Sequence, residues 1–194
     1  MTRLSEEQIT SLFHEPRTVS AFTAEPVTEE QKRRIQELTY MGPTAFNSQP
    51  LRITWVESEE ARQRLVSHMM EGNREKTAAA PLTAILSFDK QWHKLFPTFM
   101  PPMAEAAAMF EAEEARIPAG TLNSGLQAGY FMTAIRALGL DAGPMTGADF
   151  AGIEQEFFAG SEQQSFMVVN IGHGEAPVYD RAPRFGFEDV TRSI

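Results

Sequence analysis

The chain has 194 residues, of which 17 are Lys or Arg and 26 are Asp or Glu, so its formal net charge is −9 at pH 7. Hydrophobic residues make up 42% of the chain, as in an ordinary globular domain, and this length favours one domain. The chain has no cysteine, which excludes thiolate catalysis, Cys-ligated zinc, iron–sulfur clusters and disulfides. The acidic balance argues against non-specific nucleic-acid binding, because phosphate contacts need a basic face.

Neither a membrane span nor a secretory signal is predicted. No run approaches the ~18 uninterrupted apolar residues of a membrane helix, and the first residues lack the apolar core of a signal peptide. We therefore expect a cytoplasmic protein that does not bind membranes. The basic triplet at residues 32–34 falls on a predicted helix, where we expect it on a solvated face.

Two helices are predicted near the N-terminus from capping boxes, in which a hydroxyl caps the helix and a Glu or Gln three residues later reaches back. Ser5 pairs in this way with Gln8, and Thr28 pairs with Gln31. Apolar residues follow each box at helical spacing. A strand is then predicted over 51–56, where apolar and polar residues alternate, and a helix from residue 58 to about residue 70.

A short apolar, β-branched run after Pro81 predicts a second strand over 82–88. Residues 103–116 are rich in Ala and Glu, so their propensity predicts a helix. The most apolar helix is predicted over 121–138, ending at Gly139 in the C′ position. Its small-residue stripe (Gly125, Ala128, Gly129) fits either a buried core helix or a dimer-interface helix.

A third strand is predicted over 165–171, closed by Gly172, and together these elements indicate an α+β fold with a sheet between helices. The tail, residues 173–194, has no helical period. It is either disordered or an arm packed on another surface. Its aromatic residues Tyr179, Phe185 and Phe187 favour the arm.

Several common chemistries lack their residues. There is no Gly-x-Ser-x-Gly nucleophile elbow, no His-Glu-x-x-His metal motif and no complete dinucleotide fingerprint. The histidines at positions 14, 68, 93 and 173 have no companion motif. If the protein is an enzyme, the remaining interpretation is that a bound cofactor carries out the chemistry.

Four segments, in order along the chain, form a recognisable pattern. They are Arg17-Thr-Val-Ser-Ala-Phe22 with Pro26 after it, Gly42-Pro-Thr-Ala-Phe-Asn-Ser-Gln-Pro50, Asn73-Arg-Glu-Lys76, and Ala137-Leu-Gly-Leu140 with Gly143-Pro-Met-Thr-Gly147. With Arg184 as a late basic residue, they span residues 17–184 and resemble the FMN-dependent nitroreductase family. The pattern looks closest to the malonic semialdehyde reductases of pyrimidine catabolism, whose Gly-Pro-Met and Pro-Arg pairings recur here.

The resemblance implies a nitroreductase-like fold, a mainly antiparallel sheet sandwiched between helices, in an intertwined homodimer with FMN at two interface sites. Residues 1–194 would form a single FMN-binding domain, and 173–194 would be a C-terminal arm packing on the partner subunit. It also implies an NAD(P)H-dependent oxidoreductase with ping-pong hydride transfer, in which the flavin carries the hydride and no catalytic side chain is assigned.

The implied cofactor-binding residues fall into three groups. An FMN phosphate, with about two negative charges, is suited by arginine forks and hydroxyls, and the resemblance implies Arg17, Thr18, Ser20 and Arg184 for it. Near the flavin ring it implies Asn73 and Lys76, whose amide and cation favour a reduced, anionic ring, with the backbone of Pro144, Met145, Thr146 and Gly147 toward N5. Asn47 resembles a residue lent to the flavin of the opposite subunit, and Pro43 and Thr44 belong to the same segment.

Two residues depart from the family pattern. Ser20 stands where the family has a second basic residue, which puts one phosphate or ring contact in doubt, and Leu51 stands where a Trp often follows Gln-Pro. The stretch 88–118 falls where the family has a variable lid. Its apolar residues either cover the ring or pack in the core, and the cations nearby suit a carboxylate. The apolar set is Trp92, Phe96, Phe99, Met100 and Met103; the cations are Lys90, His93, Lys94 and Arg52.

The electron acceptor stays open at this point. A small aldehyde acid, with malonic semialdehyde reduced to 3-hydroxypropionate, is the favoured substrate, and a nitroaromatic or quinone is the alternative. Two readings of other classes also stand: a flavin-binding protein without turnover, and a structural dimer without a cofactor.

Overall fold

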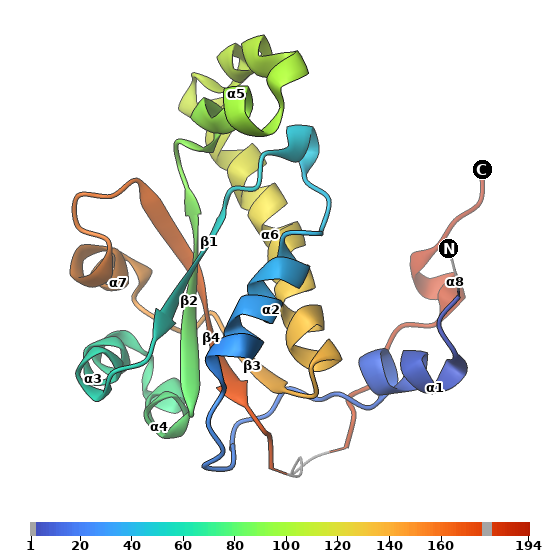
Figure 1. Cartoon of the computed structure of the whole chain (residues 1–194). Helices are drawn as coiled ribbons and strands as arrows, with labels where there is room; N and C mark the ends of the chain where they lie inside the picture. Colours follow the sequence, from blue (N-terminus) through green and yellow to red (C-terminus); the bar gives the residue numbers. More distant parts are fainter. Residues whose placement is uncertain (1–2, 176–179) are drawn as a thin grey trace.

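A four-stranded antiparallel sheet, in the order β1-β2-β4-β3, forms the centre of the molecule (Figure 1). The computed structural model describes residues 3–175 and 180–194, so Tyr179 of the expected arm lies outside the described residues. The strands are β1 (Leu51–Val56), β2 (Leu82–Asp89), β3 (Asp141–Met145) and β4 (Gln163–Gly172). The sheet, its helices and their order confirm the predicted α+β fold.

Helices cover both faces of this sheet. The helices α2 (Glu29–Thr39) and α6 (Glu113–Ala137) pack on one face, and α3 (Glu59–His68) and α7 (Phe150–Phe157) pack on the other. Strand β2 alternates between them: Leu82, Ala84 and Leu86 belong to the core under α2 and α6, whereas Ile85 belongs to the core under α3 and α7. This period of two is what the strand geometry requires of a sheet buried on both faces.

The predicted helix starts near the N-terminus are confirmed. Both capping boxes form, at Ser5 before α1 (Glu6–Ile9) and at Thr28 before α2. Helix α1 continues directly into a π-helical turn, η1 (Thr10–His14). The three predicted strands and the helix after Ser58 are also present, and Gly139 has the positive φ of 73° that a C′ glycine adopts.

The helix predicted over 103–116 is wrong. Instead, short helical pieces precede α6: η3 (Trp92–Leu95), α5 (Phe96–Phe99) and the 3₁₀ segment η4 (Pro101–Phe110). Helix α6 begins at Glu113, earlier than predicted, and includes Pro118. Tertiary packing overrides the Ala-rich propensity here, since the Phe110 ring lies 4.7 Å from the Trp92 ring in an aromatic cluster.

Three elements of the body of the molecule, as well as the short helix α8 (Phe187–Val190) in the tail, were not identified in the sequence. Strand β3 contains Gly143 and Pro144, which argue against a central strand but are tolerated at the sheet edge that β3 occupies. Helix α4 (Glu71–Ala79) begins without a side-chain cap and has a weak apolar stripe, so its pattern was faint. Helix α7 is eight residues long, capped by Asp149.

Helix α6 has an unusual distribution of side chains, because polar residues are buried and apolar ones are exposed. Asn123, Ser124 and Gln127 are buried against the rest of the chain. Leu122, Leu126 and Tyr130 are 67%, 48% and 44% exposed. Exposed apolar residues that recur every four positions form one stripe along a helix. In the described part of the chain nothing covers this stripe.

The C-terminal segment and the N-terminal helix both project from the body of the molecule (Figure 1). The tail returns to the N-terminal segment through Arg181, which donates to the carbonyls of His14 and Pro16. Beyond it, α8 (Phe187–Val190) leaves Phe185 and Phe187 81% and 73% exposed. Among residues 3–175 and 180–194, no helix is long and apolar enough to cross a membrane.

Candidate functional site

A pocket of about 380 Å³ opens at the end of the sheet where β3 begins and β4 ends. Seven of the thirteen predicted cofactor-binding residues line it, although they come from four separate stretches of the chain. They are Arg17, Thr18, Ser20, Lys76, Pro144, Met145 and Arg184. The remaining lining residues are Pro16, Val19, Arg136, Gly143, Asn170, Asp180, Arg181 and Ala182.

The wall formed by residues 16–20 is held against the sheet by backbone contacts. Phe22 bridges Gly174 just beyond the end of β4, and the Thr23 N–H donates to the His173 carbonyl at 2.8 Å. The Val19 carbonyl oxygen then lies so close to Gly143 that a Cβ there would be only 2.7 Å away. Glycine at position 143 is therefore needed for residues 17–20 to approach β3.

Positive charge is concentrated in this pocket, although the whole chain is acidic. Its lining carries four arginines and Lys76, with Asp180 as its only carboxylate. The Arg17 guanidinium donates to the carbonyls of His14 and Glu15 at 3.0 and 2.9 Å. These bonds fix the side chain while leaving its charge free of a carboxylate partner among the described residues. Such an array of guanidinium donors suits a phosphate.

Two of these cations, Arg136 and Arg181, were missed in the sequence. Desolvation lowers the pKa of the Arg181 guanidinium, and the positive charges of Arg17 and Arg184 lower it further. This crowding of like charges is relieved when an anion binds between them. Arg181 lies three residues before the predicted Arg184, and this proximity could have identified it as a second cation of the same site. Arg136, near the end of a helix, had none.

Lys76 reaches the pocket from α4, and a buried asparagine fixes the backbone beneath it. The Asn170 side chain donates to the Lys76 carbonyl at 3.1 Å and accepts from the Thr83 hydroxyl at 2.9 Å. Asn170 was also missed. As the one polar residue in the apolar run 166–171 of β4, it could have been identified as a candidate for a specific buried contact.

Three further predicted residues lie next to one another, outside the lining. The Asn73 side chain donates to the Gly147 carbonyl at 2.8 Å, and a Cβ at Gly147 would be 2.6 Å from that same amide. Thr146 precedes Gly147 in the chain. The hydrogen bond between Asn73 and Gly147 joins α4 to the segment after β3, so Asn73 holds this segment close to the pocket.

The other three predicted residues, Pro43, Thr44 and Asn47, lie at the opposite end of the sheet. They belong to the loop 42–50, which leads into β1, whose first residue pairs with Phe88. By contrast, the pocket lies at the end where Gly143 pairs with Asn170 (Figure 1). The structure therefore does not bring these three residues together with the other ten within one chain.

The loop 42–50 has an unusual backbone. Phe46, Asn47 and Gln49 all adopt positive φ, at 56°, 50° and 44°, a region that L-residues other than Asn and Asp rarely enter. Such conformations persist only where neighbouring groups hold them, and they concentrate at functional sites. The Asn47 amide donates to the Phe99 carbonyl at 3.0 Å.

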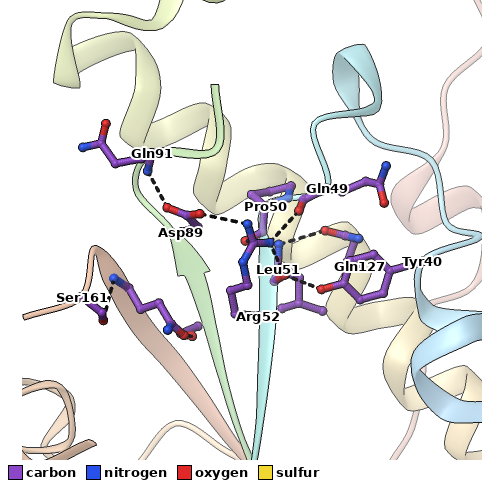
Figure 2. A network of polar contacts seen from close by, with 11 residues as sticks. Tyr40, Gln49, Pro50, Leu51, Arg52, Asp89, Gln91, Gln127 and Ser161 are labelled. Carbon is purple, nitrogen blue, oxygen red and sulfur yellow. Dashed lines mark hydrogen bonds and ion pairs between the residues drawn. The ribbon is translucent and has the colours of Figure 1, made fainter. Parts of the chain in front are cut away.

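A polar network fixes the end of this loop and the start of β1 (Figure 2). The Arg52 guanidinium donates to the carbonyls of Gln49 and Leu51 at 3.0 and 2.8 Å, and to the Asp89 carboxylate at 2.9 Å. The Leu51 N–H donates to the Gln127 side chain at 3.1 Å. Its carbonyl also accepts from the Tyr40 hydroxyl, and burial raises the pKa of that phenol.

The expected lid residues divide into two sets. Trp92 and Phe96 are buried in the aromatic cluster with Phe46 and Phe110, so they pack in the core. Phe99 and Met103 are exposed and remain available to cover a ligand. Of the expected cations in this region, Lys90 pairs with Glu162 and Arg52 with Asp89, so each already has a carboxylate partner.

Comparison with known proteins identifies the family of this chain. A model of the nitroreductase family matches residues 15–173. The chain belongs to the nitroreductase family. A relative from Streptomyces coelicolor, provisionally named an NADH dehydrogenase/NAD(P)H nitroreductase, is 51% identical over 185 residues, which cover 94% of each chain.

Solved structures confirm the fold. A nitroreductase-type protein from Bacillus subtilis superposes with a TM-score of 0.87 at 20% identity, covering 98% of this chain and 100% of that one. A second, from Exiguobacterium sibiricum and solved in complex with FMN, gives 0.85 at 17% identity and 99% coverage of both chains. Family membership confirms the prediction of a nitroreductase-family oxidoreductase. The malonic semialdehyde reductase subgroup stays a prediction.

Proposed function

We propose that this protein is an FMN-dependent NAD(P)H oxidoreductase that works as a homodimer. The observation that carries the proposal is the cationic pocket at the β3–β4 end of the sheet, where seven residues of the family pattern lie together. The relative from S. coelicolor has a name that includes NAD(P)H, and the structure from E. sibiricum contains FMN. Both support the proposal.

The residues of the pocket fit FMN. Its phosphate requires cations and hydroxyl donors, and Arg17, Arg181, Arg184, Thr18 and Ser20 supply both. The cations beside Ser20 offset the family's missing second basic residue. The close approach of Val19 to Gly143 shapes a narrow wall, and Pro144 and Met145 offer an apolar floor for a flat ring.

Bound in this pocket, FMN would supply the hydride chemistry between NAD(P)H and an acceptor. The chain's own groups orient the ring and favour its reduced form. Lys76, which has no ion-pair partner in the described part of the chain, would hold a positive charge where negative charge accumulates on the ring. Asn170 fixes the backbone of Lys76, and Asn73 fixes the segment after Met145. No side chain is assigned as the proton donor.

Three observations support a homodimer. The loop carrying Thr44 and Asn47 lies at the far end of the sheet from the pocket, so a second copy is needed to complete the site as the family pattern implies. Helix α6 exposes the stripe Leu122, Leu126 and Tyr130. The tail after Arg181 exposes further aromatic residues. Obligate interfaces of this kind bury on the order of 2,000–5,000 Å².

The purified protein tests the cofactor and the dimer together. We expect a yellow protein with the mass of a dimer by light scattering, from which heat releases FMN identified against FMN, FAD and riboflavin standards. Recovery of FAD, of no flavin, or of a flavin-loaded monomer contradicts the proposal. Steady-state NAD(P)H consumption with an acceptor separates an enzyme from a flavin-binding protein without turnover.

For the acceptor, we propose a small aldehyde acid, with malonic semialdehyde reduced to 3-hydroxypropionate. Its support is the resemblance of the segments 42–47, 72–81 and 140–145 to the malonic semialdehyde reductases. A neutral nitroaromatic or quinone is the second candidate. It is favoured by the exposed apolar Phe99 and Met103, and by the ion pairing of Lys90 and Arg52, which weakens their attraction for a carboxylate.

Comparison of kcat/KM for malonic semialdehyde, a nitroarene and a quinone decides between the two acceptors. The first proposal expects the aldehyde to be reduced fastest. If the aldehyde is reduced no faster than free FMN with NAD(P)H allows, while nitroarenes turn over, the second candidate is correct.

A further inference from the structure

The loop 42–50 is held at both ends by side chains outside it. At its start, the Ala45 N–H donates to the Asn123 side-chain oxygen at 2.7 Å, and the Asn123 amide in turn donates to the Ala119 carbonyl at 2.8 Å. Asn123 is 4% exposed and comes from α6. A buried asparagine with both ends bonded has one allowed orientation, so it fixes the position of Ala45.

At the end of the loop, Arg52 has the corresponding role. Its guanidinium bonds to the carbonyls of Gln49 and Leu51 and is oriented by Asp89 (Figure 2). The Asp89 carboxylate is itself fixed, because its other oxygen accepts from the Gln91 N–H at 2.8 Å. A planar guanidinium with several donors can hold adjacent carbonyls in one arrangement, which a lysine cannot do.

Between these two contacts lie the residues with positive φ, Phe46, Asn47 and Gln49. A loop without external contacts would relax toward ordinary backbone angles, because each left-handed residue is disfavoured. Inside the loop, the Thr44 hydroxyl accepts from the Gln49 N–H at 3.2 Å, and the Asn47 N–H donates to the Thr44 carbonyl at 3.1 Å. These bonds do not reach the rest of the molecule, so the position of the strained backbone depends on contacts outside the loop, which are the supports in α6 and β1 and the bond from Asn47 to the Phe99 carbonyl.

We propose that Asn123 and Arg52 are positioning residues, here called the loop clamp, which keep Thr44 and Asn47 preformed for the flavin held in the pocket of a second copy of this chain. The inference rests on the proposed function for the flavin and the dimer. It adds two residues that lie outside the family pattern and far from the pocket. A preformed loop loses little conformational freedom on binding, so affinity is gained without new contacts.

The clamp itself is tested without flavin. In hydrogen–deuterium exchange of the purified protein, Asn123→Ala should speed exchange of the Ala45 amide about 10-fold, the value of roughly one lost hydrogen bond. Ser124→Ala is the matched control, since Ser124 is the neighbouring buried residue and its hydroxyl has no partner in the described part of the chain. Unchanged exchange at Ala45 in Asn123→Ala overturns the clamp.

The second arm tests whether the clamp acts on the flavin bound in its own subunit or on the flavin bound in the partner subunit. The double variant Asn123→Ala/Arg52→Lys should weaken FMN binding roughly 10- to 100-fold in its homodimer, if two hydrogen-bonding supports are lost. A heterodimer is then prepared in which one subunit carries the double variant and the other carries Arg17→Glu. The two chains are coexpressed with different tags so that the heterodimer can be isolated. If the clamp acts across the interface, one site is intact and the other carries both defects, so one FMN binds per dimer with wild-type affinity.

If the clamp only stabilises its own subunit, each site of the heterodimer carries one defect and neither binds FMN with wild-type affinity, which overturns the inference. Should Asn123→Ala fail to fold, Arg52→Lys alone, at a partly exposed position, is used in both arms, and the first arm then follows exchange of the Gln49 amide at the end of the loop that Arg52 holds. A wild-type protein that binds no FMN overturns the proposed function. The exchange measurement at Ala45 still decides whether Asn123 holds the loop.

Discussion

The two ends of the sheet hold their candidate site residues in opposite ways. At the pocket end, guanidinium groups such as Arg17 and Arg181 are fixed by backbone carbonyls and have no carboxylate partner among residues 3–175 and 180–194. At the loop end, neutral groups such as Asn47 and Thr44 are placed by a strained backbone. Under the proposed function, we expect the first arrangement to select a ligand by charge and the second to select it by shape. A charged site therefore tolerates ordinary backbone, whereas a neutral site needs a backbone fixed in advance.

The largest effect is expected from Gly143→Ala at the pocket end. The new Cβ would lie 2.7 Å from the Val19 carbonyl, so residues 17–20 must move and take Arg17 and Thr18 with them. FMN affinity should fall roughly 100-fold or more, equivalent to one or two lost charged hydrogen bonds. Isothermal titration with FMN measures this. Gly72→Ala is the control, because a Cβ there meets open space. Near-normal affinity in Gly143→Ala would refute this account of the pocket wall.

Lys76→Ala tests whether charge at the pocket end also acts on the reaction. Removal of the cation should lower the reduction potential of the flavin and slow its reduction by NAD(P)H roughly 10- to 100-fold, the effect of about 1–3 kcal/mol. Stopped-flow absorbance follows the reduction. Arg33→Ala, which removes an exposed cation on α2, serves as the control. A wild-type reduction rate in Lys76→Ala removes Lys76 from the site.

Much of the fold could be predicted from local signals. A few neighbouring residues were enough to predict several elements. These signals are the capping boxes at Ser5 and Thr28, the alternation over 51–56, and Gly139. Local signals failed where packing decides. The Ala-rich segment after Pro102 is 3₁₀ helix because Phe110 packs on Trp92. Strand β3 has a poor sequence for a strand and exists because β4 offers it a free edge.

The candidate site follows the same division. Arg17, Lys76 and Arg184 could be singled out because motifs in order along the chain contain them, and the structure places all three in one pocket. Asn123 and Arg52 could not be recognised, since their role depends on contacts 78 residues away in the chain for Asn123 and on the backbone angles of a loop for Arg52. The spacing of apolar residues in a sequence predicts which face of a helix or strand is buried. It does not predict which backbone carbonyl a side chain contacts.

A smaller effect is expected from pH at the loop end, whose aromatic cluster contains the buried His93. Burial lowers the pKa of His93, and Arg116 and Lys94 lower it further, whereas Glu111 opposes this. The unfolded chain therefore binds a proton at higher pH than the folded one does. The contribution to stability is complete above the unfolded pKa of about 6.5 and is lost as the pH falls from there toward the folded pKa.

Urea unfolding between pH 5 and 8 measures this contribution. The wild-type free energy of unfolding should fall on acidification more steeply than that of His93→Gln, which has no titrating group at this position. Parallel curves for the two proteins would show that His93 titrates alike in both states.

The smallest effect concerns backbone strain at Gly160, in a turn that lines neither the pocket nor the loop 42–50. Gly160 adopts a φ of 77° and a Cβ there would meet nothing within 4 Å, so Gly160→Ala adds strain without a clash. The free energy of unfolding should fall by about 1 kcal/mol, the cost of a left-handed alanine. FMN affinity should not change, because this turn touches neither end of the site. Urea unfolding and FMN titration of the same sample provide both values.

At ordinary turns such as this one the chain uses glycine for positive φ, whereas at Phe46 and Gln49 it keeps large side chains despite the strain. A change in FMN affinity in Gly160→Ala would mean that strain in a turn without contact to the pocket also reaches the site, and the contrast between the loop 42–50 and an ordinary turn would be lost.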